Sequence, residues 1–286
     1  MWRVQQVQSL TDIPAPAWDA LAGTENPFVS HAFLSGLEEH DCLAAHGWLP
    51  CHLLVFSGPN LIGALPLYLR SNSNGEFVFD WSWAEAYERA GGRYYPKLVS
   101  AIPFTPVSGP RLLVHADVKD ANAMRSLLLD SALDFAGQNH LSSWHCLFPD
   151  PPAADWLGTA ALLPRHTCQF HWHNHGYRDF QDFLDTLSSK PRKQIRRERR
   201  GVADAGVEIV RFTGAEITQE LWELFYAFYC TTFERHWGSP RLTLPFFRAL
   251  SDKLPEQTLL ILARQGGEWI AGAFALLGSR TLFGRH

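Results

Sequence analysis

The most distinctive chemical feature of the sequence is a run of basic side chains past its middle. Seven lysines and arginines fall within the eleven residues 190–200, where Glu198 is the one acid. Ser188 or Ser189 can cap a helix here, and Pro191 suits its first turn. Such a helix can grip phosphates of a nucleotide, an RNA backbone or a lipid-linked pyrophosphate. The alternative is a solvated face whose long stems cover apolar neighbours. The cations predicted to bind substrate are Lys190, Arg192, Lys193, Arg196 and Arg197.

A second candidate group combines two tyrosines and a lysine. Tyr94, Tyr95 and Lys97 lie in a stretch rich in proline and glycine that runs from Gly91 to Pro110. Phenol and ammonium groups can position an amine or protonate a leaving group, and loops often carry functional sites. The alternative is aromatic packing beneath a long loop. We expect these three side chains to contact substrate.

Histidines gather in a third place, at His166, His171, His173 and His175. His171 and His173 would share one face of a strand, as a metal site could require. No acidic or cysteine ligand has a suggestive spacing, however, and Cys168 would point to the opposite face from His171. We therefore expect no metal. Trp172 is predicted to form part of the wall of a substrate cleft.

The general base is not evident from the sequence. Glu234 or His236, at the end of a helix expected from Thr218, could act as a base if it faced the cleft. The sequence contains no G-x-S-x-G elbow, Walker loop or H-E-x-x-H motif. We therefore assign no catalytic residue from the sequence.

Composition limits the class of protein. The chain has 286 residues, of which 46% are hydrophobic and 19% charged, and its net charge is −4. These values predict a folded core and give no general sign of nucleic-acid or membrane binding. The five cysteines are widely spaced without a C-x-x-C pair, which favours free thiols in a reducing compartment. No apolar run approaches the roughly 20 residues that cross a bilayer, so a cytoplasmic location is expected.

The pattern of apolar residues predicts alternating strands and helices. Cys51–Phe56 and Leu61–Leu69 should pair as a hairpin. Ala121–Gly137 carries an apolar stripe with helical spacing and ends at a glycine. Phe77–Trp83 and Thr167–Trp172 are further expected strands.

The later part of the chain repeats the beginning of this order. A strand at Val207–Phe212 is followed by two helices, a hairpin built from Leu259–Ala263 and Trp269–Leu277, and a third strand from Thr281. The two hairpin sequences can be aligned so that Gly63 lies over Gly272. Upstream, Phe33 aligns with Phe246. These correspondences favour an internal duplication.

We therefore predict an α/β fold of two tandem units, each with a mixed, largely antiparallel sheet flanked by helices. Residues 1–175 would form the first unit. Residues 176–286 would hold the basic helix and the beginning of a second unit that is cut short, which predicts a longer natural protein. The order of elements is the one with which the GNAT (N-acetyltransferase) fold begins.

Three stretches resemble the FemAB-like family of predicted N-acyltransferases, linked to peptidoglycan biosynthesis and recognition. They are Asn26–Glu39, Arg93–Leu113 and the unusual segment Cys168–Arg200. The resemblance implies tandem GNAT-like units in a C-terminally incomplete chain. It also implies acyl or aminoacyl transfer to an amine acceptor, for which a small molecule or a cell-wall precursor is expected.

One departure from acyl-CoA-dependent GNAT enzymes concerns the donor. Their Q/R-x-x-G-x-G/A turn, whose amides hold a pyrophosphate, has no counterpart in this sequence. Acyl-CoA and aminoacyl-tRNA both stay open as donors. Two other functions also stay open: a GNAT-like binding module without catalysis that recognises a phosphorylated precursor, and an RNA-binding protein. The sequence does not indicate an oligomeric state.

Overall fold

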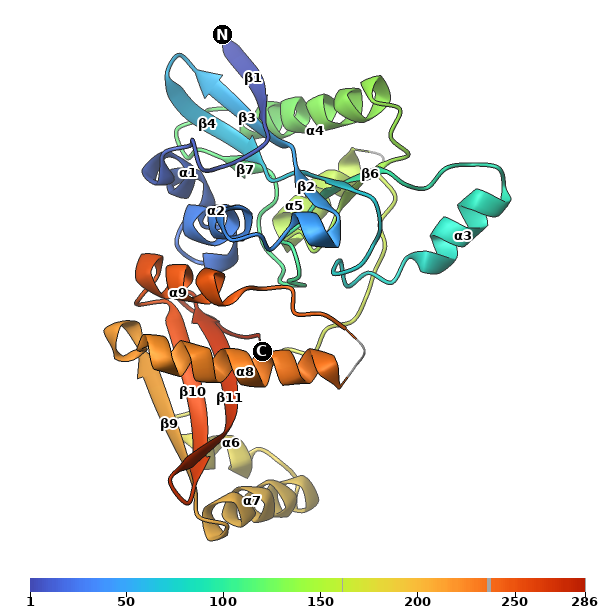
Figure 1. Cartoon of the computed structure of the whole chain (residues 1–286). Coiled ribbons are helices and arrows are strands. Elements are labelled where there is room, and N and C mark those ends of the chain that lie inside the picture. Colours follow the sequence, from blue (N-terminus) through green and yellow to red (C-terminus); the bar gives the residue numbers. More distant parts are fainter. Residues whose placement is uncertain (161, 236–237, 286) are drawn as a thin grey trace.

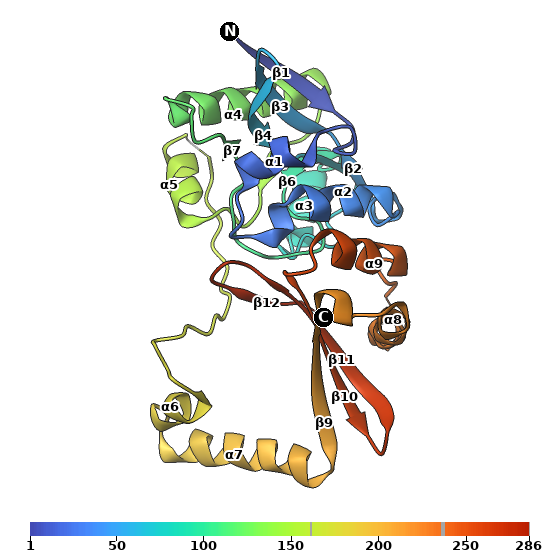
Figure 2. The ribbon, with the colours of Figure 1, turned by 90° about the vertical axis from the view of Figure 1, so that its left-hand side faces the viewer.

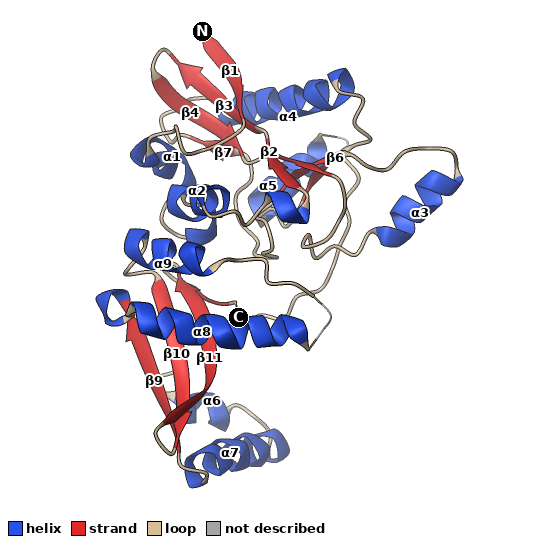
Figure 3. Cartoon of the chain, in the orientation of Figure 1, coloured by secondary structure: helices blue, strands red, loops and turns tan. Residues whose placement is uncertain are grey.

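The computed structural model describes residues 1–160, 162–235 and 238–285. This part of the chain contains three four-stranded sheets, each accompanied by helices (Figure 1 and Figure 3). Two sheets lie in the first half of the chain and the third lies in the second half. The predicted α/β class is therefore confirmed.

The first sheet is antiparallel and has helices on both faces. Its strands, in spatial order, are β1 (Trp2–Val7), β3 (His52–Ser57), β4 (Asn60–Leu65) and β7 (Leu113–Val114). Leu54 and Ala64 point toward α1 (Ala15–Ala22), η1 (Pro27–Val29) and α2 (His31–Glu39), with which they share a core. Val55 and Leu65 point the opposite way, toward α4 (Ala121–Gln138). This alternation buries both faces of the β3–β4 hairpin.

The second sheet continues the same hairpin. Its strands are β2 (Trp48–Pro50), β5 (Tyr68–Arg70), β6 (Lys97–Ser100) and β8 (Trp144–Cys146), and the β6–β8 pair is parallel. The short turn η2 (Ala44–His46) precedes β2, and α5 (Pro151–Thr159) follows β8. Pro66 lies between β4 and β5 and separates them, because proline has no N–H to donate to the hydrogen bonds between strands. The predicted hairpin is thus confirmed but is divided between two sheets.

The second half contains the third sheet and a pair of helices at its outer end. After α6 (Phe180–Asp185) and α7 (Ser189–Asp204) come β9 (Val207–Thr213), η3 (Gly214–Glu216), α8 (Gln219–Glu234), α9 (Leu244–Lys253), β10 (Thr258–Gln265), β11 (Glu268–Leu277) and β12 (Leu282–Gly284). The antiparallel strand order is β12-β11-β10-β9. In both views α7 lies at the end of the molecule farthest from the first half (Figure 1 and Figure 2).

The internal repeat is present in the order of elements, but the residue alignment of the hairpins is wrong. Each half runs strand, two helices, then an antiparallel hairpin. Gly63 pairs with Val55 and faces Met124 of α4, whereas Gly272 pairs with Leu262 and faces α8. Gly63 thus points to the face of its sheet opposite α1 and α2, whereas Gly272 points to the face covered by α8. Neighbouring positions on a strand point to opposite faces of the sheet, so an alignment that is wrong by one residue pairs positions from different faces. The two glycines therefore do not correspond.

The repeated helices do correspond, and they contact each other. Phe33 and Phe246 each occupy the third position of a helix whose cap, Ser30 in α2 and Thr243 in α9, accepts a hydrogen bond from that phenylalanine's backbone N–H. Their rings pack edge to face with centroids 5.4 Å apart. The Thr243 hydroxyl also donates to the His40 carbonyl at 3.0 Å. One hydrophobic core consequently runs through both halves. The unit boundary at residue 175 stays a prediction.

Two predicted strands are not formed. In the place of Phe77–Trp83 the chain makes a loop and then α3 (Trp81–Arg89), because Phe77 and Phe79 have φ values of 62° and 51°, outside the extended region. Residues 167–172 are extended but have no strand partner, and Phe170 is 97% exposed. Figure 2 shows this segment crossing from α5 to α6 apart from the sheets. The alternation of apolar and polar residues in this segment predicts a strand, but a strand also needs a neighbouring strand with which to pair.

Candidate functional site

A cavity lies between the two halves of the chain, with a volume of about 290 Å³. Both halves contribute walls, which are mostly aromatic. The lining residues are Phe77, Phe104, Tyr229, Phe233, Arg241, Leu242 and Arg285. An aromatic cavity with a small number of charged groups is a usual form of ligand site.

Two arginines give this cavity its charge. The guanidinium of Arg241 lies 5.9 Å from the centre of the Phe77 ring, and that of Arg285 lies 5.5 Å from the same ring. Arg285 also donates to the Phe104 carbonyl, and its Nε lies 3.4 Å from the Thr105 hydroxyl. Neither arginine forms an ion pair with an acid in the described part of the chain. Two cations without acidic partners favour an anionic ligand.

The charge of Arg285 persists at neutral pH despite its surroundings. Burial lowers the pKa of Arg285 to about 10, and Arg241 contributes to this lowering. A group with that pKa is still protonated near pH 7. A bound carboxylate or phosphate would be attracted by both guanidinium groups.

The loop 71–80 carries Phe77 to the cavity and is held by a buried lysine. Lys97 has no exposed surface and donates to Ser73 Oγ at 2.9 Å, to Glu76 Oε2 at 2.8 Å and to Asp80 Oδ2 at 2.6 Å. All three acceptors belong to the loop. Since left-handed conformations of residues such as Phe77 cost of order 1–3 kcal/mol, these bonds help to maintain the shape of the cavity wall.

Arg70 holds the same loop from β5. Its Nε donates to Glu76 Oε1 at 3.1 Å, and one Nη donates to the Asn74 carbonyl at 2.7 Å. The guanidinium stacks 3.8 Å from the centre of a Trp48 ring. At Gly75, where φ is +81°, an added Cβ would fall 2.7 Å from the ring of Phe104. The loop is therefore in close contact with another cavity wall.

The contacts of Asp80 with Lys97 and Tyr94 shift the pKa values of the two acidic groups. Burial alone would raise the pKa of Asp80, but hydrogen bonds from Lys97, Ser73 and Tyr94 lower it to about 2. Burial and the hydrogen bond to Asp80 raise the pKa of Tyr94 well above its usual range. Asp80 is thus ionised and Tyr94 neutral at physiological pH. We call Arg70, Glu76, Asp80 and Lys97 the buried ionic cluster.

The structure brings Tyr94, Tyr95 and Lys97 together, but around the loop and not around the cavity. Tyr94 donates to Asp80 Oδ2 at 2.7 Å, and the Tyr95 hydroxyl lies 2.8 Å from Ser73 Oγ. None of the three lines the cavity. Tyr94 and Lys97 are buried against loop 71–80 and Tyr95 is partly buried, so the substrate contact expected of these three residues stays a prediction.

Trp172 and the histidines lie elsewhere. Trp172 is 62% exposed, and its nearest ring neighbours are Tyr177 and Phe183 at 5.9 and 5.8 Å. The rings of His171 and His173 lie 6.3 Å apart on the same extended segment. Within residues 1–160, 162–235 and 238–285 no group of three or more potential ligands is placed to hold a metal.

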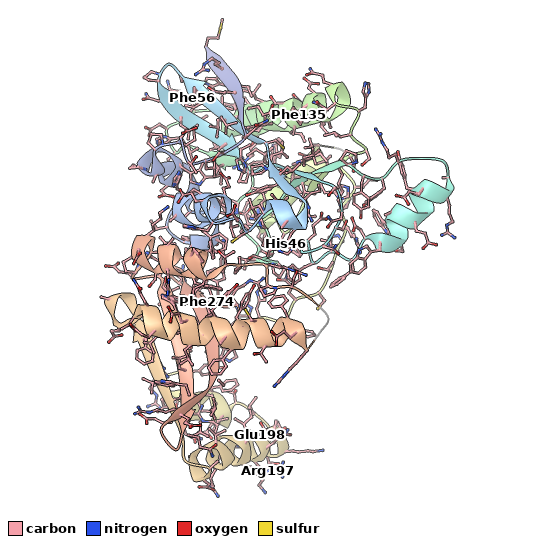
Figure 4. The ribbon with its side chains drawn as sticks, viewed as in Figure 1. His46, Phe56, Phe135, Arg197, Glu198 and Phe274 are labelled. Carbon is pink, nitrogen blue, oxygen red and sulfur yellow. The ribbon has the colours of Figure 1, made fainter. Side chains whose placement is uncertain are left out.

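The basic run forms α7, as predicted, and its cations differ in their surroundings. Arg192 donates to Asp185 at 3.0 Å, and Arg196 lies 3.9 Å from the same carboxylate. Lys190, Lys193 and Arg197 are exposed and make no ion pair with the described acids. Figure 4 shows Arg197 on α7, distant from His46 at the junction of the halves. The predicted site residues thus occupy three separate places.

Sequence reasoning missed the residues that line the cavity. Arg241 and Arg285 are 44 positions apart and belong to no motif, so the sequence gave no signal that they converge. Phe104 and Tyr229 look like ordinary core aromatics. Of the two suggested bases, Glu234 ends α8 directly after the lining residue Phe233 but is exposed and does not itself line the cavity, and His236 lies outside the described part of the chain.

Helix α4 follows β7 in the first half of the chain. Asp120 caps this helix, and its Oδ1 accepts from the Ala123 N–H at 2.9 Å. A carboxylate at this position repels an approaching phosphate.

Comparison with known proteins finds one matching family. A family model named FemAB-like, with the description peptidoglycan biosynthesis/recognition, matches residues 9–286. The expectation of a C-terminally incomplete chain is not borne out by this match. No curated protein matches the sequence.

Two solved structures are similar in outline. One is a tandem GNAT protein from the clavulanic acid biosynthesis pathway, with 13% identity and a TM-score of 0.41 over 98% of this chain and 76% of the other. The second is FemX, with 13% identity and a TM-score of 0.45 over 91% of this chain. The chain spans 58% of the length of FemX. No helix in the described residues has the length and apolar character to span a membrane.

We predict that Lys97→Met lowers the free energy of unfolding by about 3–5 kcal/mol, because it leaves a buried carboxylate without its cation. Lys253→Met is the matched control, since Lys253 forms a partly exposed pair with Glu39 at 2.9 Å; its effect should stay within about 1 kcal/mol. Denaturant unfolding followed by fluorescence gives both values. Equal stability of the two variants would contradict the role given to Lys97.

Proposed function

Because the chain belongs to the FemAB-like family of peptidoglycan biosynthesis/recognition proteins, we propose that it transfers an acyl or aminoacyl group from an activated donor to an amine of a cell-wall precursor. The observation that carries the proposal is the aromatic cavity with its two arginines. Peptidoglycan precursors carry carboxylates and phosphates, which are the groups that unpaired guanidinium ions bind.

The cavity has a form that suits acceptor binding. Arg241 and Arg285 would hold an acidic group of the precursor, while Phe77 and Phe104 would pack against its less polar parts. A bidentate contact also fixes orientation. Transfer to an amine depends largely on such positioning, because alignment of the amine with an acyl carbonyl removes much of the entropic barrier.

The donor is proposed to be held partly by α7. Its exposed cations Lys190, Lys193 and Arg197 can contact the phosphates of a donor such as an aminoacyl-tRNA. Acyl-CoA receives less support, because the sequence lacks the Q/R-x-x-G-x-G/A turn whose amides hold its pyrophosphate. The donor would thus be recognised at a place different from the acceptor cavity.

A non-catalytic binding module is the second candidate function. It is favoured by the lining of the cavity, which in the described residues has no carboxylate, imidazole or thiol. Such a module would recognise a phosphorylated precursor with the same arginines but would leave it unchanged.

The experiment that separates the two functions is a transfer assay. The protein is incubated with a soluble nucleotide-linked cell-wall precursor and either tRNA charged with a labelled amino acid or labelled acetyl-CoA. We expect label to appear in the precursor with the charged tRNA. Binding of the precursor without transfer from either donor would favour the binding module, and absence of both would contradict the proposal.

We predict that Arg241→Gln raises the Kd for the precursor about 10- to 100-fold, the effect of losing ~1.5–3 kcal/mol from a charged hydrogen bond. Arg211→Gln provides the control, since Arg211 is an exposed arginine on β9 without an ion pair in the described structure. Isothermal titration calorimetry would measure both. An unchanged Kd in Arg241→Gln would remove the cavity from the proposal.

We also predict that the double variant Lys193→Gln/Arg197→Gln binds tRNA less tightly and with a weaker dependence on salt. Loss of two phosphate contacts should lower the slope of log Kd against log salt by about 1.5. Arg248→Gln/Arg264→Gln removes the same charge from two arginines that already pair with Glu223 and Glu208. The idea fails if both double variants lose the same affinity in filter-binding titrations.

A further inference from the structure

His46 borders the cavity without being one of its lining residues. Its ring packs edge to face against Phe104, with centroids 5.4 Å apart and an interplanar angle of 81°. It also lies within electrostatic reach of Arg241. Figure 4 places His46 at the junction of the two halves of the chain. An imidazole therefore stands against Phe104, one wall of a cavity whose lining has no carboxylate, imidazole or thiol among the described residues.

The backbone at His46 is fixed by the buried ionic cluster. The carbonyl of His46 accepts from an Nη of Arg70 at 3.0 Å. The next residue, Gly47, has a φ of +72°, and an added Cβ would lie 2.6 Å from Ser71 Oγ. His46 thus ends a tight turn that is packed against the loop 71–80. Its side chain is partly exposed.

We propose that His46 accepts the proton of the attacking amine, a catalytic role that rests on the proposed transferase function. The amine nitrogen forms a bond to the acyl carbonyl carbon, and the proton that it loses passes to the free ring nitrogen of His46. The bond between the carbonyl carbon and the ester oxygen of the donor then breaks. The imidazolium returns the proton to that oxygen, and the carrier leaves as an alcohol.

The protonation state of His46 agrees with this role. Burial lowers the pKa of His46 below its ordinary value, and the charges of Arg241 and Arg70 lower it further, while the Pro240 backbone acts in the opposite direction. Arg241 faces His46 from the second half and Arg70 from β5. His46 is therefore neutral near pH 7 and can take up a proton. As the pH falls through its pKa, protonated His46 can no longer act and the transfer rate should fall.

The first test uses the donor and nucleotide-linked precursor of the transfer assay. His46→Gln should lower kcat about 10²- to 10⁴-fold, the usual size of a general-base contribution, with little change in the Kd for the precursor. His46→Ala should regain activity when imidazole is added. His115→Gln serves as the histidine control. Unchanged kcat in His46→Gln, while wild-type protein transfers label, would overturn the proposal and leave the transferase function intact.

A second measurement does not depend on activity. An NMR titration of His46 in the free protein should give a pKa below the ordinary value for histidine, and Arg241→Gln should raise that pKa. A value at or above the ordinary one would overturn the base role, whatever donor the protein uses. If wild-type protein transfers label to no acceptor, the proposed function fails, and the base role fails with it.

Discussion

The buried ionic cluster is the interaction on which the functional part of this molecule depends. Two cations from neighbouring strands, Arg70 and Lys97, meet two carboxylates from one loop, Glu76 and Asp80. In a low-dielectric interior, each charge is tolerated because its partner is present. The loop cannot leave without exposing the strands' cations or separating the pairs. The cluster therefore determines the position of Phe77, and through the His46 carbonyl it also holds the turn η2 that borders the cavity.

Local structure was largely predictable, whereas the site was not. The helix expected at Ala121–Gly137 is α4, and the two hairpins and the repeated order of elements are also found. These features arise from caps, periodicity and turns, which are properties of neighbouring residues. The sequence around Lys97 suggests a substrate contact, because nothing near it in sequence indicates that Glu76 and Asp80 accept its hydrogen bonds. Arg241 and Arg285 meet only through the tertiary fold.

The net charge of the chain does not show where its basic residues gather. A net charge of −4 gives no sign of an anionic ligand. Yet the cavity arginines lack acidic partners among the described residues, and α7 presents further free cations at the opposite end of the second half. Two separate basic places suit two separate anionic partners. This division is consistent with a reaction in which donor and acceptor are recognised independently.

The contact between α2 and α9 has a consequence for how the protein unfolds and evolves. Phe33 packs on Phe246 in a core that is continuous through both halves, whereas a second core beneath α4 lies in the first half alone. Separation of the halves would expose the part of the shared core that each contributes. A destabilising substitution in the shared core should therefore weaken both halves together, so selection for stability acts on them jointly.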